Sequence, residues 1–190
     1  MDYNDEGFYN GLEFHKLPLI YQDLTKRLGI QSFNLEVVDY REIINNNDIL
    51  QYFKNAPAII LFYPLSDTFG HFVGLTFYNN IINYYDPYGG NVDYIKKYNK
   101  VDSNYQEIYN TLSKLLYDLY RNNNIEIHFN EYKHQSMRNK SATCGRWCAL
   151  RCALYFLDTK EFNKAVNRLY LLSGDKDKDW MVYNMTKNII

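Results

Sequence analysis

The sequence predicts an α+β fold in which a small mixed sheet is packed by helices, with a cysteine-containing helix at the centre. Three observations support this class: compact β-rich apolar runs, amphipathic stripes of helical spacing, and their interleaving along the chain. At 190 residues the chain is long enough to bury one sizeable core. No Gly/Ser-rich linker or Pro-rich spacer divides it, so we expect one domain over residues 1–190.

The first part of the chain predicts two short helical segments and a strand. Leucine and isoleucine at helical spacing indicate a helix over 17–28, and Gly29 is placed to end it in the left-handed conformation. A short strand is expected over 34–39. A short helix is expected over 49–54, with Asp48 as its cap.

The middle of the chain predicts three strands. The run AIILFYP over 58–64 is typical of a buried strand. The runs over 71–78 and 81–88 flank Asn79-Asn80, a pair that favours the tight turn of a β-hairpin. We therefore expect these last two strands to pair directly with each other.

The last part of the chain is mostly helical. An apolar stripe predicts an amphipathic helix over 106–121, and the alternating run over 125–129 predicts a strand. A loop then leads into a helix expected over roughly 144–158. Two more helical segments, near 160–172 and 177–188, follow it.

Composition excludes several classes of protein. A formal net charge of -1 gives no global attraction to nucleic acid or to an anionic membrane. No apolar run approaches the roughly 18 residues that span a bilayer, and residues 1–14 lack the pattern of a secretory signal. The excess of Tyr, Asn, Lys and Ile is typical of an AT-rich genome, such as that of a virus, a protist or a low-GC bacterium.

The three cysteines lie within nine residues, an arrangement that does not suit a disulfide framework. We expect a reducing, intracellular setting. Cys148 and Cys152 share one face of the expected helix and are predicted to be buried core residues. The C-x3-C-x3-C spacing differs by one residue from that of radical iron–sulfur enzymes, so no metal or other cofactor is expected.

Cys144 differs from the other two because it would open the helix. A thiolate is favoured at a helix N-terminus or beside an imidazolium. The preceding Thr143 offers a polar cap region, and Gly145 would leave backbone N–H groups open to an oxyanion. We therefore interpret Cys144 as a candidate nucleophile.

A candidate base and a candidate orienting carboxylate lie upstream on the predicted hairpin. With a two-residue turn, position 78 pairs with 81, so Asp86 falls diagonal to His71 on the same face. Asp86 could orient the imidazole, and His71 could deprotonate Cys144. The order His, Asp, Cys along the chain differs from that of papain-type enzymes. The other histidines are weaker candidates: His15 lies in the N-terminal segment and His128 alternates with apolar neighbours in a strand. His134 lies in the loop before the cysteine and could line the cleft, but it has no carboxylate in a comparable place.

These segments resemble a known group of enzymes. The strand start GHFV at 70–73, the strand end YDPYG at 85–89 and the segment Q…SATCGRWC resemble the adenovirus-protease and SUMO-protease superfamily of cysteine peptidases. The resemblance covers about 58–158 and is greatest to the capsid-maturation proteases of virophages and related double-stranded DNA viruses. It implies the papain-like fold of that superfamily, with a central helix that carries the nucleophile.

The resemblance also implies roles for single residues. Cys144 would be the nucleophile, His71 the base, Asp86 the orienting residue and Gln135 the amide of the oxyanion hole. The expected activity is an endopeptidase that needs no cofactor and cleaves capsid or other virion precursors after a small residue, commonly Gly. It would act in the virion and in the cytoplasm of the infected cell, without a membrane partner. An activating peptide or DNA is known for such enzymes, but the net charge gives DNA no independent support.

The sequence departs from the superfamily at two points. The glutamine usually lies six or seven residues before the cysteine, whereas Gln135 lies nine before Cys144. Either the loop is longer here, or Asn139 or backbone N–H groups take the role. Phe72 stands where relatives often carry Trp, which changes packing more than chemistry.

Three other functions remain open from the sequence. Deconjugation of ubiquitin-like modifiers shares the chemistry and differs in substrate. A YopJ-type acetyltransferase has the same triad order but needs a basic surface for the phosphates of coenzyme A. A capsid-binding module with an inactive site is disfavoured because all three triad members are present. For the acetyltransferase, the only concentrated basic residues near the cysteine are Lys133, Arg138, Lys140 and Arg146.

Overall fold

The structure is a computed structural model that describes residues 14–46, 48–65, 70–93, 111–136 and 142–187. One mixed sheet of five strands runs through it in the order β1-β2-β3-β4-β5. The central pairs β2–β3 and β3–β4 are antiparallel, and the outer pairs β1–β2 and β4–β5 are parallel. The strands span Glu36–Asp39 (β1), Ala58–Pro64 (β2), Gly70–Tyr78 (β3), Ile81–Tyr85 (β4) and Glu126–Phe129 (β5).

The predicted hairpin is confirmed. Tyr78 pairs with Ile81, and both turn residues have positive φ, 50° at Asn79 and 64° at Asn80. Positive φ at both central positions is the requirement of a type I′ turn, which asparagine tolerates better than most residues. The second strand ends at Tyr85 rather than at 88, so Asp86 lies just beyond the ladder.

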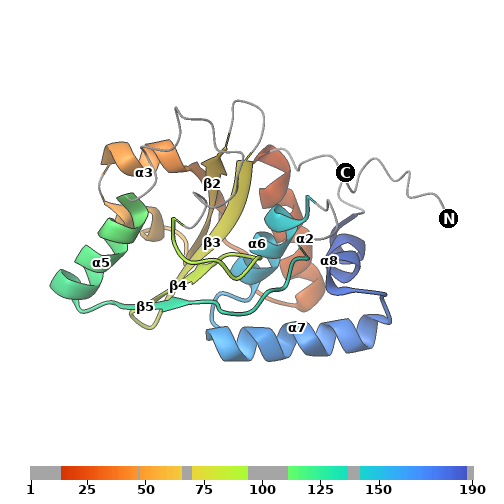
Figure 1. Cartoon of the computed structure of the whole chain (residues 1–190). Coiled ribbons are helices and arrows are strands. Elements are labelled where there is room, and N and C mark those ends of the chain that lie inside the picture. Colours follow the sequence, from red (N-terminus) through yellow and green to blue (C-terminus); the bar gives the residue numbers. More distant parts are fainter. Residues whose placement is uncertain (1–13, 47, 66–69, 94–110, 137–141, 188–190) are drawn as a thin grey trace.

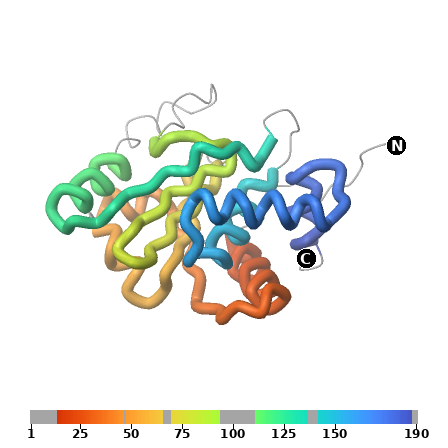
Figure 2. The backbone as a smooth tube through the Cα atoms, turned by 90° about the horizontal axis from the view of Figure 1, so that it is seen from below, coloured from red at the N-terminus to blue at the C-terminus, as the bar shows by residue number. Residues whose placement is uncertain are grey.

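Helices cover both faces of the sheet (Figures 1 and 2). Tyr40–Asn46 (α3) and Thr111–Asn123 (α5) pack on one face, around Leu61, Val73 and Leu75. The other face carries the remaining helices. These are Leu17–Leu28 (α2), Cys144–Ala153 (α6), Thr159–Ser173 (α7) and Lys178–Thr186 (α8). Two 3-10 helices, Phe14–Lys16 (η1) and Ile49–Phe53 (η2), complete the described elements.

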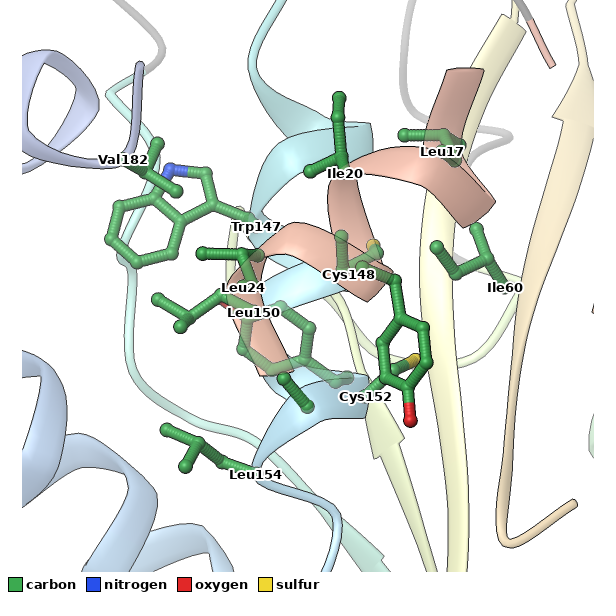
Figure 3. Close-up of a cluster of buried hydrophobic side chains, with 14 of the residues drawn as sticks. Leu17, Ile20, Leu24, Ile60, Trp147, Cys148, Leu150, Cys152, Leu154 and Val182 are labelled. Carbon is green, nitrogen blue, oxygen red and sulfur yellow. The ribbon is translucent and has the colours of Figure 1, made fainter. Parts of the chain in front are cut away.

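The cysteine helix α6 lies at the centre of the second core, as expected. Nine of its ten residues are buried, and Trp147, Cys148 and Leu150 share one core with the apolar stripe of α2 and with Val182 of α8 (Figure 3). Alternation along β2 divides its side chains between the two cores: Ile60 faces α6, whereas Ile59 and Leu61 belong to the core beneath α5. A helix buried on every side explains why α6 lacks an amphipathic stripe.

Several boundaries correct the expectations from sequence. The helix α6 ends at Ala153, not near 158, because the buried Arg151 side chain donates to the Leu154 and Leu157 carbonyls (2.8 and 2.9 Å) and closes the helix there. The helix α3 was not predicted. The helix expected over 106–121 is described only from Thr111, since its first residues lie outside the described ranges.

Other boundaries agree with the sequence. Gly29 ends α2 with φ 65°, and Asp48 caps η2 by accepting the Leu50 N–H at 3.0 Å. The combination of a mixed sheet with helices on it agrees with the predicted α+β class. In the described part of the chain, no helix is both long and apolar enough to cross a membrane.

Candidate active site

His71 and Asp86 form a buried pair at the end of the hairpin. His71 Nε2 lies 2.9 Å from Asp86 Oδ1, and the two side chains are 5% and 1% exposed. His71 is the second residue of β3, and Asp86 directly follows β4. The diagonal contact predicted from the hairpin register is therefore present, although Asp86 has already left the strand.

The Asp86 backbone is held by a side chain that imitates a neighbouring strand. Asn130, which directly follows β5, accepts the Asp86 N–H at 2.7 Å and donates to the Asp86 carbonyl at 2.8 Å. The amide thus continues the pairing of β4 with β5 by one residue. Tyr88 adds a third anchor, because its backbone N–H donates to Asp86 Oδ1 at 2.9 Å. These hydrogen bonds hold Asp86 in place independently of its contact with His71.

Tyr88 also covers the imidazole. Its ring stacks on His71 with centroids 5.1 Å apart and planes 19° from parallel. Burial raises the pKa of Tyr88 the most, and the nearby Cys144, Asp179 and Asp86 raise it further. The phenol therefore stays neutral and shields one face of the imidazole from water.

Cys144 is the first residue of α6 and completes the group. Its side chain is hydrogen-bonded to His71, and the residue is partly exposed. Burial alone would lower the pKa of His71, but the Asp86 carboxylate and the Cys144 thiol outweigh it and raise that pKa from 6.5 to about 10. Asp86 Oδ2 is buried and accepts no hydrogen bond from the described residues, so His71 is the cation that balances this carboxylate. The arrangement favours an imidazolium at neutral pH.

The start of α6 departs from one expectation. Thr143 occupies the cap position, but its side chain makes no cap hydrogen bond. Its hydroxyl instead donates to Asp179 Oδ1 on α8 at 2.8 Å. Gly145 has a packing reason as well as the predicted chemical one, since a Cβ there would lie 2.7 Å from Leu17 Cδ2. Glycine lets α2 and α6 approach closely at the point where α6 begins.

Gln135 comes from a separate segment that is hydrogen-bonded to the loop after Asp86. Its backbone N–H donates to the Pro87 carbonyl at 2.9 Å, and the neighbouring His134 N–H shares that acceptor at 3.0 Å. The residue is 2% exposed. Gln135 is therefore fixed next to the loop that follows Asp86. The alternative donor Asn139 falls outside the described residues.

The remaining histidines lie outside this group, and only His134 is buried. His134 lies between Tyr85 and Asn163, 3.0 Å from the Tyr85 hydroxyl and 3.1 Å from Asn163 Oδ1. Burial lowers the pKa of His134 to about 4, so its ring is neutral at physiological pH. His128 lies 3.2 Å from the exposed Glu126, and His15 lies in η1.

The described residues offer little to a basic or a metal-binding interpretation. Arg146 is buried, donates to the Thr186 hydroxyl and stacks over Tyr183, so it does not contribute to a surface for phosphates. Within the described ranges, no group of three or more His, Cys, Asp or Glu side chains converges as a metal site would.

Reasoning from sequence missed Asn130, Tyr88 and Asp179. Tyr88 lies within the quoted YDPYG segment and could have been found by extending the hairpin register, which places position 88 opposite His71. Asn130 and Asp179 reach the site from 44 residues beyond Asp86 and 36 residues beyond Thr143. No pattern of residue spacing connects them to it.

Comparison with known proteins places the chain among viral proteins. No protein-family model matches it. It is 33% identical over 155 residues to "Uncharacterized protein V9" of Sputnik virophage, an alignment that covers 81% of this chain and 86% of the virophage protein. Identity at this level over most of both chains indicates common descent. The chain belongs to the same family as this Sputnik virophage protein.

Proposed function

We propose that this chain is a cysteine endopeptidase that processes capsid or other virion precursor proteins. The observation that carries the proposal is the chain of contacts from Asp86 through His71 to Cys144, between the end of the hairpin and the start of α6. A nucleophile, a base and an orienting carboxylate in contact are the parts of a hydrolytic triad. The papain-like arrangement of the adenovirus-protease and SUMO-protease superfamily is part of the same proposal.

The proposed reaction begins with the proton on His71. The Cys144 thiolate attacks the carbonyl carbon of the scissile peptide bond, and a bond forms between Sγ and that carbon. Since Asp86 holds Nε2, Nδ1 is the nitrogen that serves the thiol and the leaving group. The imidazolium gives its proton to the leaving amine as the C–N bond breaks, which leaves a thioester on Cys144.

The second half of the reaction restores the enzyme. His71, now neutral, takes a proton from a water molecule that attacks the thioester. The C–S bond breaks, the carboxylic acid product leaves and loses its remaining proton to solvent, and the first proton stays on the imidazole beside the Cys144 thiolate. Asp86 carries charge and orientation throughout and forms no bond to substrate.

The oxyanion of each tetrahedral intermediate needs preorganised donors. The first N–H groups of any α-helix lack an intrahelical acceptor, so those that follow Thr143 can supply one donor. The Gln135 side-chain amide is the second proposed donor. Its backbone anchor on Pro87 supports this assignment because it ties Gln135 to the same loop as Asp86.

The biological setting is proposed from the family relationship. Kinship with a Sputnik virophage protein supports expression of the chain during viral infection. Virion precursor polypeptides are then the proposed substrates, and the virion and the infected cell are the proposed locations. An activating peptide or DNA remains part of the proposal only through the superfamily resemblance.

The deciding experiment measures the iodoacetamide alkylation rate of each cysteine at about pH 6 by mass spectrometry. Wild type is compared with His71→Ala, and Cys148 and Cys152 serve as internal controls. We expect fast labelling of Cys144 alone, and its loss in His71→Ala, because the imidazolium stabilises a reactive thiolate. Slow and equal labelling of all three cysteines in wild type would contradict the proposal.

A further inference from the structure

We propose that Asp179 is a positioning residue that holds the Gln135 segment in place against the start of the cysteine helix. The inference rests on the proposed peptidase function and extends it to α8, an element with no assigned part in the chemistry. Its basis is a set of hydrogen bonds that joins two segments of the site through one carboxylate.

Asp179 accepts hydrogen bonds on both carboxylate oxygens from the described residues Thr143, Trp147 and Ser136, and it is only 2% exposed. Oδ1 accepts from the Thr143 hydroxyl at 2.8 Å and from Trp147 Nε1 at 3.0 Å. Oδ2 accepts from the Ser136 backbone N–H at 2.8 Å. One oxygen therefore serves the cysteine helix, and the other serves the segment that contains Gln135.

Two of these donors directly adjoin residues of the proposed active site. Thr143 directly precedes the nucleophile Cys144, and Ser136 directly follows the proposed oxyanion donor Gln135. Asp179 thus sets the separation between the two groups. Gln135 is also anchored on its other side, where its N–H donates to Pro87. A donor held from both sides does not need to reorganise as the oxyanion forms.

A buried carboxylate can also serve stability alone, and Asp93 provides the matched case. Asp93 is 7% exposed, and its Oδ1 accepts from the Tyr40 and Tyr63 hydroxyls at 2.9 and 3.3 Å. Its Oδ2 accepts the Ser113 N–H at 2.9 Å and the Ser113 hydroxyl at 2.7 Å. These partners belong to α3, β2 and α5, in the core on the opposite face of the sheet. Asp93→Asn is therefore the control for Asp179→Asn.

The two substitutions remove one acceptor each. An amide has a single acceptor oxygen, and its NH2 group cannot accept a hydrogen bond. In Asp179→Asn, the two donors of Thr143 and Trp147 favour keeping the oxygen on their side. The amide nitrogen then faces the Ser136 N–H, and the link to the Gln135 segment is lost.

The test compares two reactions of Cys144 that need different parts of the site. Acylation by p-nitrophenyl acetate forms an Sγ–acetyl bond, breaks the ester C–O bond and releases p-nitrophenolate through a tetrahedral oxyanion. Alkylation by iodoacetamide displaces iodide and forms no oxyanion. We expect Asp179→Asn to slow acylation by on the order of tenfold while alkylation at pH 6 stays within about twofold of wild type.

The control and the double mutant sharpen the result. Asp93→Asn should lower the melting temperature while leaving both reactions of the folded protein unchanged. Gln135→Ala should slow acylation by on the order of 10²-fold, the scale of one oxyanion donor. Adding Asp179→Asn to Gln135→Ala should then cause little further loss, because Asp179 acts on the reaction through Gln135.

Two results would overturn the inference alone: wild-type acylation in Asp179→Asn, or an equal fall of acylation and alkylation, which would indicate a purely structural role. A wild-type protein whose Cys144 shows no His71-dependent alkylation would instead overturn the proposed function, and this inference would fall with it.

Discussion

Cys144 and Cys152 lie eight residues apart, about two turns, in the same helix, yet their surroundings differ. Cys144 is partly exposed and hydrogen-bonded to His71. Cys152 is fully buried, its thiol contacts the Ile59 carbonyl at 3.6 Å, and burial raises its pKa to about 12. Burial likewise raises the pKa of Cys148 well above the ordinary value. Position along one helix therefore separates a candidate nucleophile from inert thiols.

The largest expected effect tests this separation directly. Cys144→Ala should reduce kcat on a peptide substrate by on the order of 10⁶, the scale reported for loss of a triad nucleophile. Cys148→Ala is the matched control, because it removes the same atom one turn further along and should leave kcat unchanged. A similar loss of activity in both variants would break the comparison.

A smaller loss is expected from Asp86→Asn. The amide oxygen can still accept from His71 and from the Tyr88 N–H, so the geometry is kept, but the charge that stabilises the imidazolium is gone. We expect kcat to fall by on the order of 10², at the lower end of the range for general acid–base catalysis. Cys144 alkylation at pH 6 should slow with it. A loss as large as that of Cys144→Ala would assign Asp86 a more direct role.

The pH dependence of stability follows from the His71 pKa. Because this pKa is raised from 6.5 to about 10, the stabilisation from the imidazolium is fully present below about pH 6.5 and is lost as the pH rises through 10. The difference in unfolding free energy between wild type and His71→Gln should therefore shrink from pH 6 to pH 10. Urea unfolding at both pH values measures it. A difference that grows with pH would reverse the assigned protonation state.

The smallest effect on activity is expected deep in the helix. Cys152→Ser keeps a donor for the Ile59 carbonyl but places a hydroxyl in an apolar core, so it should lower the unfolding free energy by about 1–2 kcal/mol. Any activity measured for the folded protein should stay the same. Thermal unfolding and kcat measured on one sample separate the two quantities, and a drop in kcat without a drop in stability would contradict the assignment.

Local patterns explain what the sequence could predict. The strands at 58–64 and 71–78, the turn at Asn79-Asn80 and the contact between His71 and Asp86 all lie within a short stretch where register is set by the turn. The contact of His71 with Cys144 was predicted from residue chemistry and is present in the fold. The catalytic activity itself stays a prediction until it is measured.

Long-range contacts explain what the sequence could not predict. Asn130 imitates a strand neighbour of Asp86, and Asp179 joins α8 to the residues before Cys144, but asparagine and aspartate in these places carry no periodic pattern. The end of α6 was missed for the same reason. Its stop depends on the Arg151 side chain turning back to two carbonyls, in a stretch whose composition would allow the helix to continue.

The two halves of the site become available at different times during synthesis. His71 and Asp86 are 15 residues apart on one hairpin, a separation that closes quickly in a folding chain. Cys144 follows 58 residues after Asp86 (144 − 86), and its helix must pack between α2 from the start of the chain and α8 from its end. A nascent chain can therefore hold a base and its partner carboxylate long before it holds a nucleophile. Under the proposed function, hydrolysis would become possible only with the finished fold, and neighbouring nascent proteins would not be cut before then.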